Sequence, residues 1–532
     1  MITRLLVTNY RSLQSFVFEP NEQMNILVGA NEAGKSTVLE SIALALSGRL
    51  NGKRASDELN PFWFNVKASN AFFDAHAAGQ APNLPEIDIE LYLSVGTAGA
   101  ERLRGINNTK AEDCPGLRLR VVPDPEQVTE ISTYLAERGL PRLIPTDLYI
   151  IEWRSFANEI LTRQPIGLGH TAINIGATRG SSQIDYKLRQ LLHDFVTPAE
   201  SVQIALQYRR ARASITDGVL KDVDRRIAED GGAFGVGLQM DQSANSHWET
   251  TVTPHIDNIP FALLGQGKQI ATRVALAMSK ATDRNQIVLI EEPEMNLTHS
   301  SLQVLLSQIT TLANGRQLFV TTHSSFVLNR LGFDDLFLLG ENGLQSLSAE
   351  TVSTETIRYF QLQSGFDTLR LVLAEQTVIV EGPSDEMVFN AAFMTVHGFE
   401  PREVGIDVVA LGTRGKRSLE LAQALNKRVV VIRDNDDRAP SHWREAAAEY
   451  LQPGRREMFV GEQAGGRTLE VQIANCNDED ILRLVLGLQP GSDVVDFMLN
   501  NKTEAAWKLA TTAESIVWPS YILDAVEFVH AG

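Results

Sequence analysis

Carboxylates crowd the end of one apolar run near the carboxyl-terminal end of the sequence. The run VVVIR (429–433) leads directly into Asp434, Asn435, Asp436 and Asp437. The chain already carries a formal net charge of −18. Further carboxylates at the carboxyl-terminal end of a buried strand repel one another strongly unless cations neutralise them. Because carboxylate oxygens are hard ligands that suit Mg²⁺ or Mn²⁺, the stretch predicts a divalent-metal site.

A second acidic segment, VIVEGPSDE (378–386), has the same form. A strand ends in Glu381, and Asp385 falls in the first turn of the helix expected next. Strand ends converge at one edge of a parallel sheet, so Glu381 can meet Asp434 and Asp436 there. Taken singly, Asp385 is as well explained as a helix cap and the others as turn residues. The ordered set favours two metal ions about 4 Å apart, as in phosphodiester cleavage.

The segment GANEAGKST (29–37) fits the pattern G-x-x-x-x-G-K-[ST] between a strand and a helix. Backbone N–H groups of such a loop face phosphates, Lys35 reaches the β- and γ-phosphates, and Ser36 holds Mg²⁺. The residues predicted to bind ATP here are Asn31, Gly34, Lys35, Ser36 and Thr37.

Two further strand ends carry groups suited to ATP hydrolysis. The apolar run 287–290 ends in Glu291, predicted beside the magnesium, and Glu292, predicted to activate the attacking water. The run LFVTT (318–322) ends at His323, predicted to sense the γ-phosphate. The alternatives are a salt-bridged strand end and a structural histidine.

A glycine-rich turn, Gly265, Gln266 and Gly267, opens another expected helix. With the three preceding motifs it makes this half resemble the ABC-type ATPases of DNA metabolism, the RecF and SMC kind. The resemblance implies that the turn caps ATP bound on a partner subunit and that Arg11 lies near the nucleotide. The family's usual turn has a serine before two glycines, which this chain lacks, so its capping of the γ-phosphate departs from the pattern.

In the acidic half, E-G after one strand and D-x-D after a later strand resemble the Toprim domain. The E-G-x-S-D form following an ABC-type ATPase is similar to the OLD (overcoming lysogenization defect) family of ATP-dependent nucleases. The resemblance implies that Glu381, Asp385, Asp434 and Asp436 hold the metals, with Glu470 as a further ligand. It also implies a basic residue near the scissile phosphate, for which Lys416 and Lys502 are both candidates.

The elements that must position these residues predict an α/β chain of several domains. Residues 1–170 and 231–350 form the two parts of an ABC-type ATPase, and residues 372–532 form a Toprim domain with carboxyl-terminal helices. Between the ATPase parts, residues 171–230 read as a charged, amphipathic helical arm inserted for dimerisation.

Composition limits the function classes. At 43% hydrophobic and 21% charged residues the chain is globular. No apolar run approaches the ~18 residues that span a bilayer, and no signal-peptide pattern is visible. Two distant cysteines, Cys114 and Cys476, favour a reducing cytoplasm over disulfides or zinc. The acidic balance argues against bulk attraction to nucleic acid, although metal ions or a local basic patch can provide it.

The sequence therefore predicts a cytoplasmic, ATP-hydrolysing, metal-dependent DNA endonuclease with a phage-defence role implied by resemblance alone. The alternative is a RecF-like repair ATPase whose Toprim unit only binds partners. DNA, a second copy of the chain in a homodimer or tetramer, and an accessory protein are the expected partners. A basic cluster is predicted either to grip DNA phosphates or to form a solvated face: Arg414, Lys416, Arg417, Lys427 and Arg428.

Overall fold

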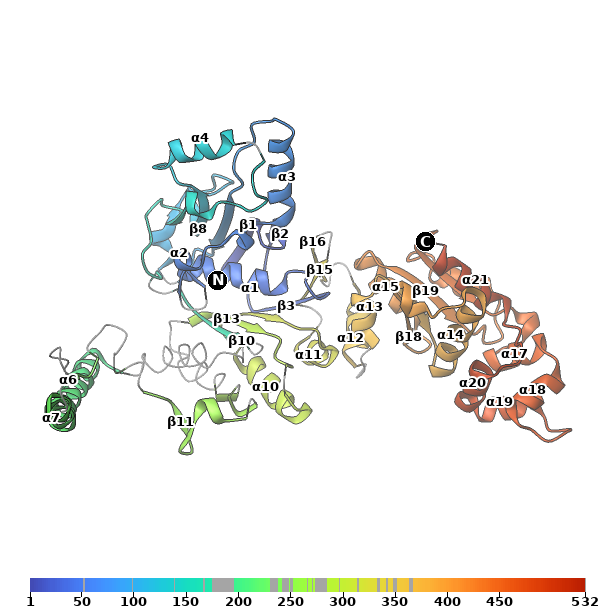
Figure 1. Ribbon diagram of the computed structural model, residues 1–532. Coiled ribbons are helices and arrows are strands. Elements are labelled where there is room, and N and C mark those ends of the chain that lie inside the picture. The colour runs from blue at the N-terminus through green and yellow to red at the C-terminus, as the bar shows by residue number, and fades with distance from the viewer. Residues whose placement is uncertain are drawn as a thin grey trace. The chain divides into compact units, whose positions relative to one another are not determined.

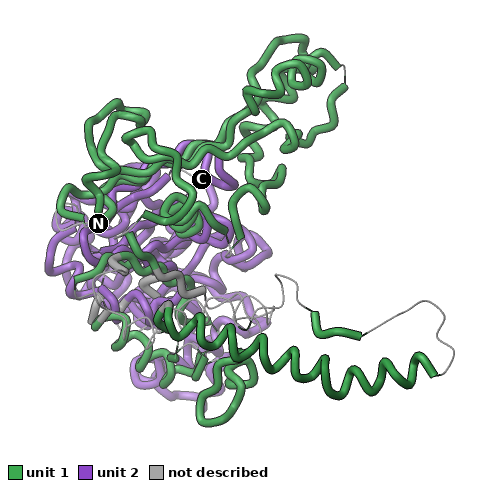
Figure 2. Tube along the Cα trace, turned by 90° about the vertical axis from the view of Figure 1, so that its left-hand side faces the viewer, with its two compact units in different colours: residues 1–9, 39–318 green, residues 10–38, 319–532 purple. Residues whose placement is uncertain are grey.

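The structure is a computed structural model of the chain. It describes residues 1–531 except 51–52, 98, 138, 166–167, 175–195, 230–237, 242–247, 249–251, 266, 270, 273–284, 296, 313–314, 333–334, 341–342, 348–351 and 363–366. The chain divides into two compact units, residues 1–9 with 39–318 and residues 10–38 with 319–532 (Figure 2).

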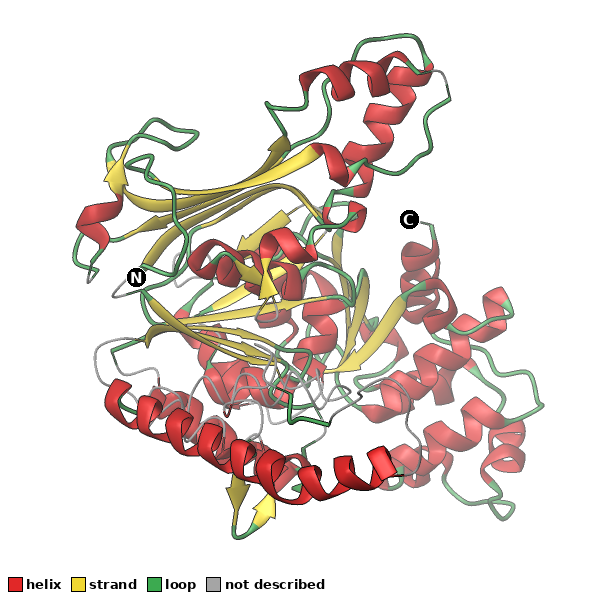
Figure 3. Cartoon of the chain, turned by 60° about the vertical axis from the view of Figure 1, so that its left-hand side comes forward, coloured by secondary structure: helices red, strands yellow, loops and turns green. Residues whose placement is uncertain are grey.

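The amino-terminal strands form an antiparallel sheet with the order β2-β1-β6-β8-β7, in which β9 also pairs with β8 (Figure 3). Its strands are β1 (Ile2–Tyr10), β2 (Leu13–Phe18), β6 (Ile87–Leu93), β7 (Arg104–Gly105), β8 (Cys114–Pro123) and β9 (Tyr149–Ser155). Branched and aromatic side chains suit a half-buried pleated surface, and they fill β6, whose sequence is IDIELYL.

A second sheet has the order β10-β13-β14-β3-β15-β16. Its strands are β3 (Met24–Gly29), β10 (Gly169–Asn174), β13 (Asn285–Glu291), β14 (Gln317–Thr321), β15 (Leu336–Gly340) and β16 (Gly343–Ser346). β10 pairs with β13 and β15 with β3 in parallel, while β15 and β16 form a hairpin. Every residue of β3 and β14 is buried, as expected for strands covered on both faces.

Helices and shorter strands complete this part of the chain. The helices are α1 (Lys35–Ser47), α2 (Ala55–Glu58), α3 (Val66–Ala77), α4 (Val128–Ala136), α10 (His299–Leu312) and α11 (Ser325–Leu331). Two small hairpins are β4 (Arg49–Leu50) with β5 (Lys53–Arg54) and β11 (His255–Ile256) with β12 (Ile259–Pro260).

The predicted arm contains a long helical stretch. α6 (Pro198–Ile215) continues through a π-helical turn (Thr216–Leu220) into α7 (Lys221–Glu229). α6 begins at a capping box, in which Thr197 and Glu200 satisfy each other's backbone N–H groups. β10 extends to Asn174, so the ATPase part runs past the boundary predicted at residue 170. The segment IDYKLRQLLHDFV (184–196), which predicts a helix at the start of the arm, lies outside the described residues except for Val196.

The carboxyl-terminal part of the chain forms a four-stranded parallel sheet with the order β18-β17-β19-β20 (Figure 1). The strands are β17 (Gln376–Val380), β18 (Ile406–Ala410), β19 (Arg428–Arg433) and β20 (Arg456–Val460). The crossover helices are α14 (Pro383–His397), α15 (Gly415–Ala424) and α16 (Pro440–Ala446). They are followed by α17 (Leu469–Cys476), α18 (Glu479–Leu486), α19 (Val494–Asn500), α20 (Lys502–Thr511) and α21 (Ser520–His530).

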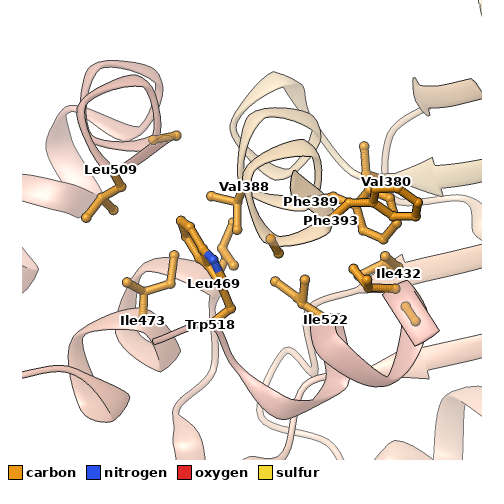
Figure 4. Close-up of a cluster of buried hydrophobic side chains, with 14 of the residues drawn as sticks. Val380, Val388, Phe389, Phe393, Ile432, Leu469, Ile473, Leu509, Trp518 and Ile522 are labelled. Carbon is orange, nitrogen blue, oxygen red and sulfur yellow. The ribbon is translucent and has the colours of Figure 1, made fainter. Parts of the chain in front are cut away.

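One apolar core joins this sheet to the carboxyl-terminal helices. Figure 4 shows Val380 and Ile432 from the sheet beside Phe389 and Phe393 of α14, with Ile522 of α21 close by. All five side chains are at most 3% exposed. Burying a phenylalanine contributes roughly 1.5–3 kcal/mol, so this core fixes the strand ends that carry the acidic residues.

Two features of this part were not predicted. The residues between the predicted ATPase and Toprim domains, 351–371, were given no helix, yet α12 (Thr354–Leu362) lies there and α13 (Asp367–Leu373) begins there. The edge strand β20 was also missed, because its five residues, REMFV, begin with two charged side chains and leave an apolar run of only three. Among the described residues, no helix combines the length and apolarity that crossing a membrane needs.

Candidate metal and nucleotide sites

The predicted metal ligands follow two strands that are hydrogen-bonded neighbours. β17 and β19 pair in parallel, with Val378 opposite Val430, so Glu381 and Asp434 leave the sheet at the same edge. The chain first moves to β18 on one side of β17 and then crosses to β19 on the other. A parallel sheet opens a crevice at such a point, which is where α/β proteins bind ligands.

Two helix starts bring further carboxylates to this edge. Asp385 lies in the first turn of α14 and accepts a hydrogen bond from the backbone N–H of Gly382 at 3.1 Å. It therefore caps the helix, as the structural alternative predicted, but its carboxyl group also interacts with Glu470. Glu470 lies in the first turn of α17 and is 5% exposed.

These carboxyl groups are buried together. Burial, reinforced by Asp385, Glu381 and Glu470, raises the pKa of Asp434 to about 8. Burial also raises the pKa of Glu381 to about 7, although the Arg433 charge opposes the shift. The pKa of Asp385 rises to about 6, chiefly through burial. Loss of solvation and mutual repulsion both disfavour the charged forms, so the site favours a bound cation.

Two side-chain cations lie at the cluster, which we call the Toprim site: Glu381, Asp385, Asp434, Asp436 and Glu470. Lys502, the first residue of α20, pairs with Glu470 at 2.9 Å. The charges of Glu470, Asp434 and Asp385 outweigh burial and raise the lysine's pKa.

Arg433 is the second cation. It forms ion pairs with Asp436 at 2.8 Å and with Glu381 at 3.5 Å. Its side chain is only 7% exposed. Asp436 is correspondingly the most open of the carboxylates, with its side chain 54% exposed.

The donor set of the Toprim site fits a hard divalent ion. Three buried carboxylate oxygens have no hydrogen-bond partner: Oε1 of Glu381, Oδ1 of Asp434 and Oε2 of Glu470. Buried polar atoms are normally satisfied. Glu381 Oε1 lies 3.5 Å from Arg433 Nη2, and the oxygens of Asp434 and Glu470 are the donors that a divalent cation would use. Within the described part of the chain, however, no three Asp, Glu, His or Cys side chains are arranged to hold one ion. Binding would therefore require these carboxyl groups to turn toward it.

The two lysine candidates occupy different surroundings. Lys502 contacts the Toprim site, whereas Lys416 pairs with Glu449 at 3.1 Å and lies over the Tyr450 ring. The structure therefore favours Lys502 as the lysine that accompanies the carboxylates.

Part of the predicted basic cluster is internal. Lys427 donates to the carbonyl of Ala374 at 2.9 Å, and Arg428 donates to that of Phe528 at 3.0 Å. Both residues lie at the amino-terminal end of β19, about 20 Å of extended strand from Asp434. The prediction that these two grip phosphates beside the site is wrong, because it ignored strand direction.

The phosphate-binding loop has the expected strand-loop-helix setting. β3 ends at Gly29 and α1 begins at Lys35, whose Nζ donates to the carbonyls of Gly29 and Ala30 at 2.9 Å each. Gly34 has φ of 103°, and a Cβ there would lie 2.6 Å from the Ser12 hydroxyl oxygen. Both the backbone conformation and the close approach require glycine. Thr37 accepts a hydrogen bond from that hydroxyl at 3.3 Å.

The other predicted nucleotide residues are placed as follows. Glu291 ends β13, and Glu292 follows with φ of 43°. His323 follows β14, just before α11. Arg11 sits in the turn between β1 and β2, with its guanidinium 5.6 Å from the Tyr10 ring centre. Asn31 and Ser36 fall on the loop and on α1.

The glycine-rich turn is partly described. Lys268 pairs with Asp257, and Gln269 is buried, donating to the carbonyl of Leu264 at 2.8 Å. Gly265 has open space where a Cβ would stand, and Gly267 has only ordinary contacts there. Gln266 lies outside the described residues.

Sequence reasoning missed two residues that interact with the carboxylates of the Toprim site, Arg433 and Tyr521. Arg433 was taken as the end of a strand, although an arginine closing an apolar run directly before D-x-D was a usable signal. Tyr521 of α21 is 4% exposed, and burial raises its pKa far above the ordinary value, with the charges of Asp434 and Asp385 adding to the shift. It lies far along the chain from both motifs, so no local pattern could have indicated it.

Family models match the segments of the chain that carry the two candidate sites. Models described as an AAA domain match residues 4–139 and 164–329. The model described as "Overcoming lysogenization defect protein-like, TOPRIM domain" matches residues 372–436, which include Glu381, Asp385, Asp434 and Asp436.

The curated relatives include an Old nuclease and RecF proteins. The Old nuclease of Escherichia phage P2 is 22% identical over 192 residues, which are 32% of this chain and 33% of the nuclease. The match thus spans about a third of that relative's length. The DNA replication and repair protein RecF of Acetivibrio thermocellus is 21% identical over 379 residues, covering 64% of this chain and 98% of RecF.

Among solved structures, an SMC head bound to the C-winged helix domain of ScpA is 14% identical, covering 66% of this chain and 98% of the other. A RecF structure with ATP is also 14% identical, covering 65% of this chain and 97% of the other. Their TM-scores, 0.35 and 0.33, are low. The assignment therefore depends on the strands, motifs and family matches.

These features define a class: a P-loop ATPase of the ABC type that also carries a Toprim domain. The Toprim match is to the OLD-like form, and the Old nuclease is among the curated relatives. The chain therefore combines ATPase segments with an OLD-like Toprim domain.

Proposed function

We propose that this protein is an ATP-binding and ATP-hydrolysing DNA endonuclease that depends on Mg²⁺ or Mn²⁺. The observation that carries the proposal is the set of buried carboxylates at the β17–β19 edge, where oxygens of Asp434 and Glu470 have no hydrogen bond and Lys502 pairs with Glu470. A module that only bound partner proteins would gain nothing from buried, repelling carboxylates. The nuclease name of the phage P2 relative points the same way.

In this proposal Glu381, Asp385, Asp434 and Glu470 hold the divalent metal. A bound ion of this kind supplies an activated water and stabilises charge on a phosphate oxygen. Lys502 then lies where it can neutralise the developing charge on the scissile phosphate. In the ATPase, the backbone N–H groups of the loop and Lys35 bind the phosphates, Ser36 and Glu291 bind Mg²⁺, and Glu292 orients water.

A cleavage assay on supercoiled and linear plasmid tests the proposal, with Mg²⁺, Mn²⁺ or EDTA and with or without ATP. Wild-type protein should nick or cut DNA only with metal, and Asp434→Asn should lose that cutting while retaining ATP hydrolysis. Asp437→Asn is the matched control, because the neighbouring Asp437 side chain is 74% exposed and 3.9 Å from Arg467. Undiminished cutting by Asp434→Asn, with normal folding shown by circular dichroism, would refute the metal-site assignment.

The second candidate is a RecF-like ATPase whose Toprim unit does not cut DNA. The specific observation in its favour is the RecF match, which covers 98% of RecF and 64% of this chain. This candidate predicts ATP-dependent DNA binding without cleavage in any metal. It also predicts that Asp434→Asn leaves DNA binding unchanged, which gel-shift titration would measure.

A role in phage defence is the finer part of the proposal, supported by the resemblance to the OLD family. It predicts that cells expressing the chain plate phage less efficiently than cells expressing Asp434→Asn at equal protein level. Equal plating on both strains, across phages of several types, would count against this role and leave the enzymatic proposal in place.

A further inference from the structure

We propose that Arg433 permanently holds one of the two cation positions of the Toprim site, so that the site takes a single divalent ion. The inference rests on the proposed function, which supplies the metal. It departs from the expectation of two ions and of Asp436 as a ligand.

Arg433 is fixed on several sides. One guanidinium nitrogen, Nη2, lies 2.8 Å from Asp436 and 3.5 Å from Glu381. Its Nε donates to the backbone carbonyl of Asp434 at 3.0 Å. The guanidinium carbon stands 3.4 Å from the centre of the Trp443 ring, and the Trp443 indole N–H donates to the carbonyl of Asn435 at 3.0 Å.

The loop that bears the D-x-D motif is built around this arrangement. Asn435 is fully buried and donates to the carbonyls of Glu462 and Gly466 at 3.2 and 2.7 Å. Asp436 follows with φ of 50°. A non-glycine residue at positive φ is uncommon. Here that conformation accompanies an Asp436 carboxylate bound to Arg433.

The carboxylates fall into two groups according to their hydrogen bonds and the cation beside them. Asp434 and Glu470 have buried oxygens without hydrogen bonds, and Lys502 is the cation beside them. Asp436 instead accepts a hydrogen bond from Arg433. Glu381 falls on the Arg433 side, because its buried Oε1, which has no hydrogen bond, lies 3.5 Å from Arg433 Nη2. The unsatisfied oxygens of Asp434 and Glu470 thus mark one cation position, and Arg433 fills the other, between Glu381 and Asp436.

A second divalent ion would have to displace the guanidinium. Arginine does not lose its proton in proteins, and its planar fork matches carboxylate geometry, so it competes for Glu381 and Asp436 at every pH. Displacement would also remove the stacking on Trp443 and a hydrogen bond to the motif backbone. A single ion at the unsatisfied oxygens requires neither loss.

Mn²⁺ binding to EDTA-treated, nucleotide-free full-length protein tests the inference. Calorimetry and the loss of free-Mn²⁺ electron spin resonance signal both count ions, and Asp434→Asn gives the background outside the Toprim site. We expect wild-type protein to bind one more ion per chain than Asp434→Asn. Arg433→Met, which removes the charge, should bind two more.

Asp436→Asn gives an independent measurement that leaves Arg433 in place. If Asp436 serves Arg433 and not the metal, this variant should bind the single ion with an affinity within about threefold of wild type. Wild-type protein binding two ions would overturn the inference even if Arg433→Met failed to fold. So would a tenfold or greater loss of Mn²⁺ affinity in Asp436→Asn. Binding of no ion by wild-type protein would instead overturn the proposed function itself.

Discussion

At the scale of single residues, two cations, Arg433 and Lys502, form ion pairs with the carboxylates of the Toprim site. Glu381 and Asp434 could be predicted as neighbours because each ends an apolar run and parallel strand ends share an edge. The position of Arg433 before D-x-D was a usable signal, but its contacts could not be predicted, since they include Trp443, seven residues beyond Asp436 on α16. The choice between Lys416 and Lys502 also depends on tertiary packing, which places α20 beside Glu470.

Asp434 should destabilise the metal-free fold at neutral and higher pH. Its pKa rises from 3.8 to about 8 on folding, so its contribution to stability is fully present below about pH 4. That contribution is lost as the pH rises through 8, because the buried group must then ionise. In EDTA at pH 8, Asp434→Asn should unfold at least about 2 °C above wild type, with a smaller gap at pH 5.

Thermal scans at both pH values, repeated with 10-fold-varied Mg²⁺, check this prediction. Added Mg²⁺ should raise the wild-type melting temperature and leave that of Asp434→Asn nearly unchanged, since only the wild type binds the ion well. Asp437→Asn is expected to follow wild type throughout. A melting temperature of Asp434→Asn below wild type at pH 8 in EDTA would contradict the account of buried repulsion.

Lys502 should matter for cleavage far more than Lys416. Replacing Lys502 with methionine removes the cation beside Glu470 and should slow cleavage by roughly 100-fold or more, the usual size of a lost electrostatic stabiliser. Lys416→Met, which removes a cation paired with Glu449, should stay within about twofold of wild type. Single-turnover cleavage rates at saturating Mn²⁺ would compare them, and equal rates in the two variants would reject the assignment.

At the scale of elements, strands built around an apolar run could be predicted from the sequence, and a strand that begins with two charged residues could not. β3, β17 and β19 each contain at least three consecutive apolar residues, and each was predicted because buried parallel strands have that composition. β20 was missed because its three apolar residues follow two charged ones. The direction of β19 also mattered. Lys427 and Arg428 lie at its amino-terminal end and Asp434 follows its carboxyl-terminal end, a separation that composition alone did not show.

The contact of α15 with β19 gives a test at this scale. Gly415 begins α15, and a Cβ there would lie 2.4 Å from Cγ1 of Val431 on β19. Gly415→Ala should therefore shift the helix or strand and lower the free energy of unfolding by about 1–3 kcal/mol. Gly340→Ala is the control, because a Cβ there meets nothing within 4 Å. Urea unfolding of both variants measures the difference, and equal stability would show that this contact yields easily.

At the scale of the whole molecule, the motifs imply more than one chain. An ABC-type site is composite, so by the family resemblance the loop at Lys35 is completed by the Gly265–Gln269 turn of another subunit. The predicted arm supplies a second reason for assembly. Four apolar side chains of its described helices are 46–71% exposed: Val202, Leu206, Ile215 and Val219. Val202 and Leu206 are four residues apart on α6, as are Ile215 and Val219 further along, so each pair lies on one helical face.

The last prediction is that the chain is at least a homodimer joined through these arm residues and tightened by ATP. Leu206→Glu with Val219→Glu places charges on the exposed apolar positions and should shift the protein to monomer at low micromolar concentration. Leu484→Glu is the control, because Leu484 is 69% exposed on α18, outside the arm.

Light scattering with and without ATP, in a Glu292→Gln background that slows hydrolysis, would separate the arm contact from the contact bridged by ATP. ATP should recover part of the dimer in the double variant, since the nucleotide-bridged contact does not involve the arm. A wild-type monomer that ATP leaves unchanged would exclude both the arm interface and the composite ATP site.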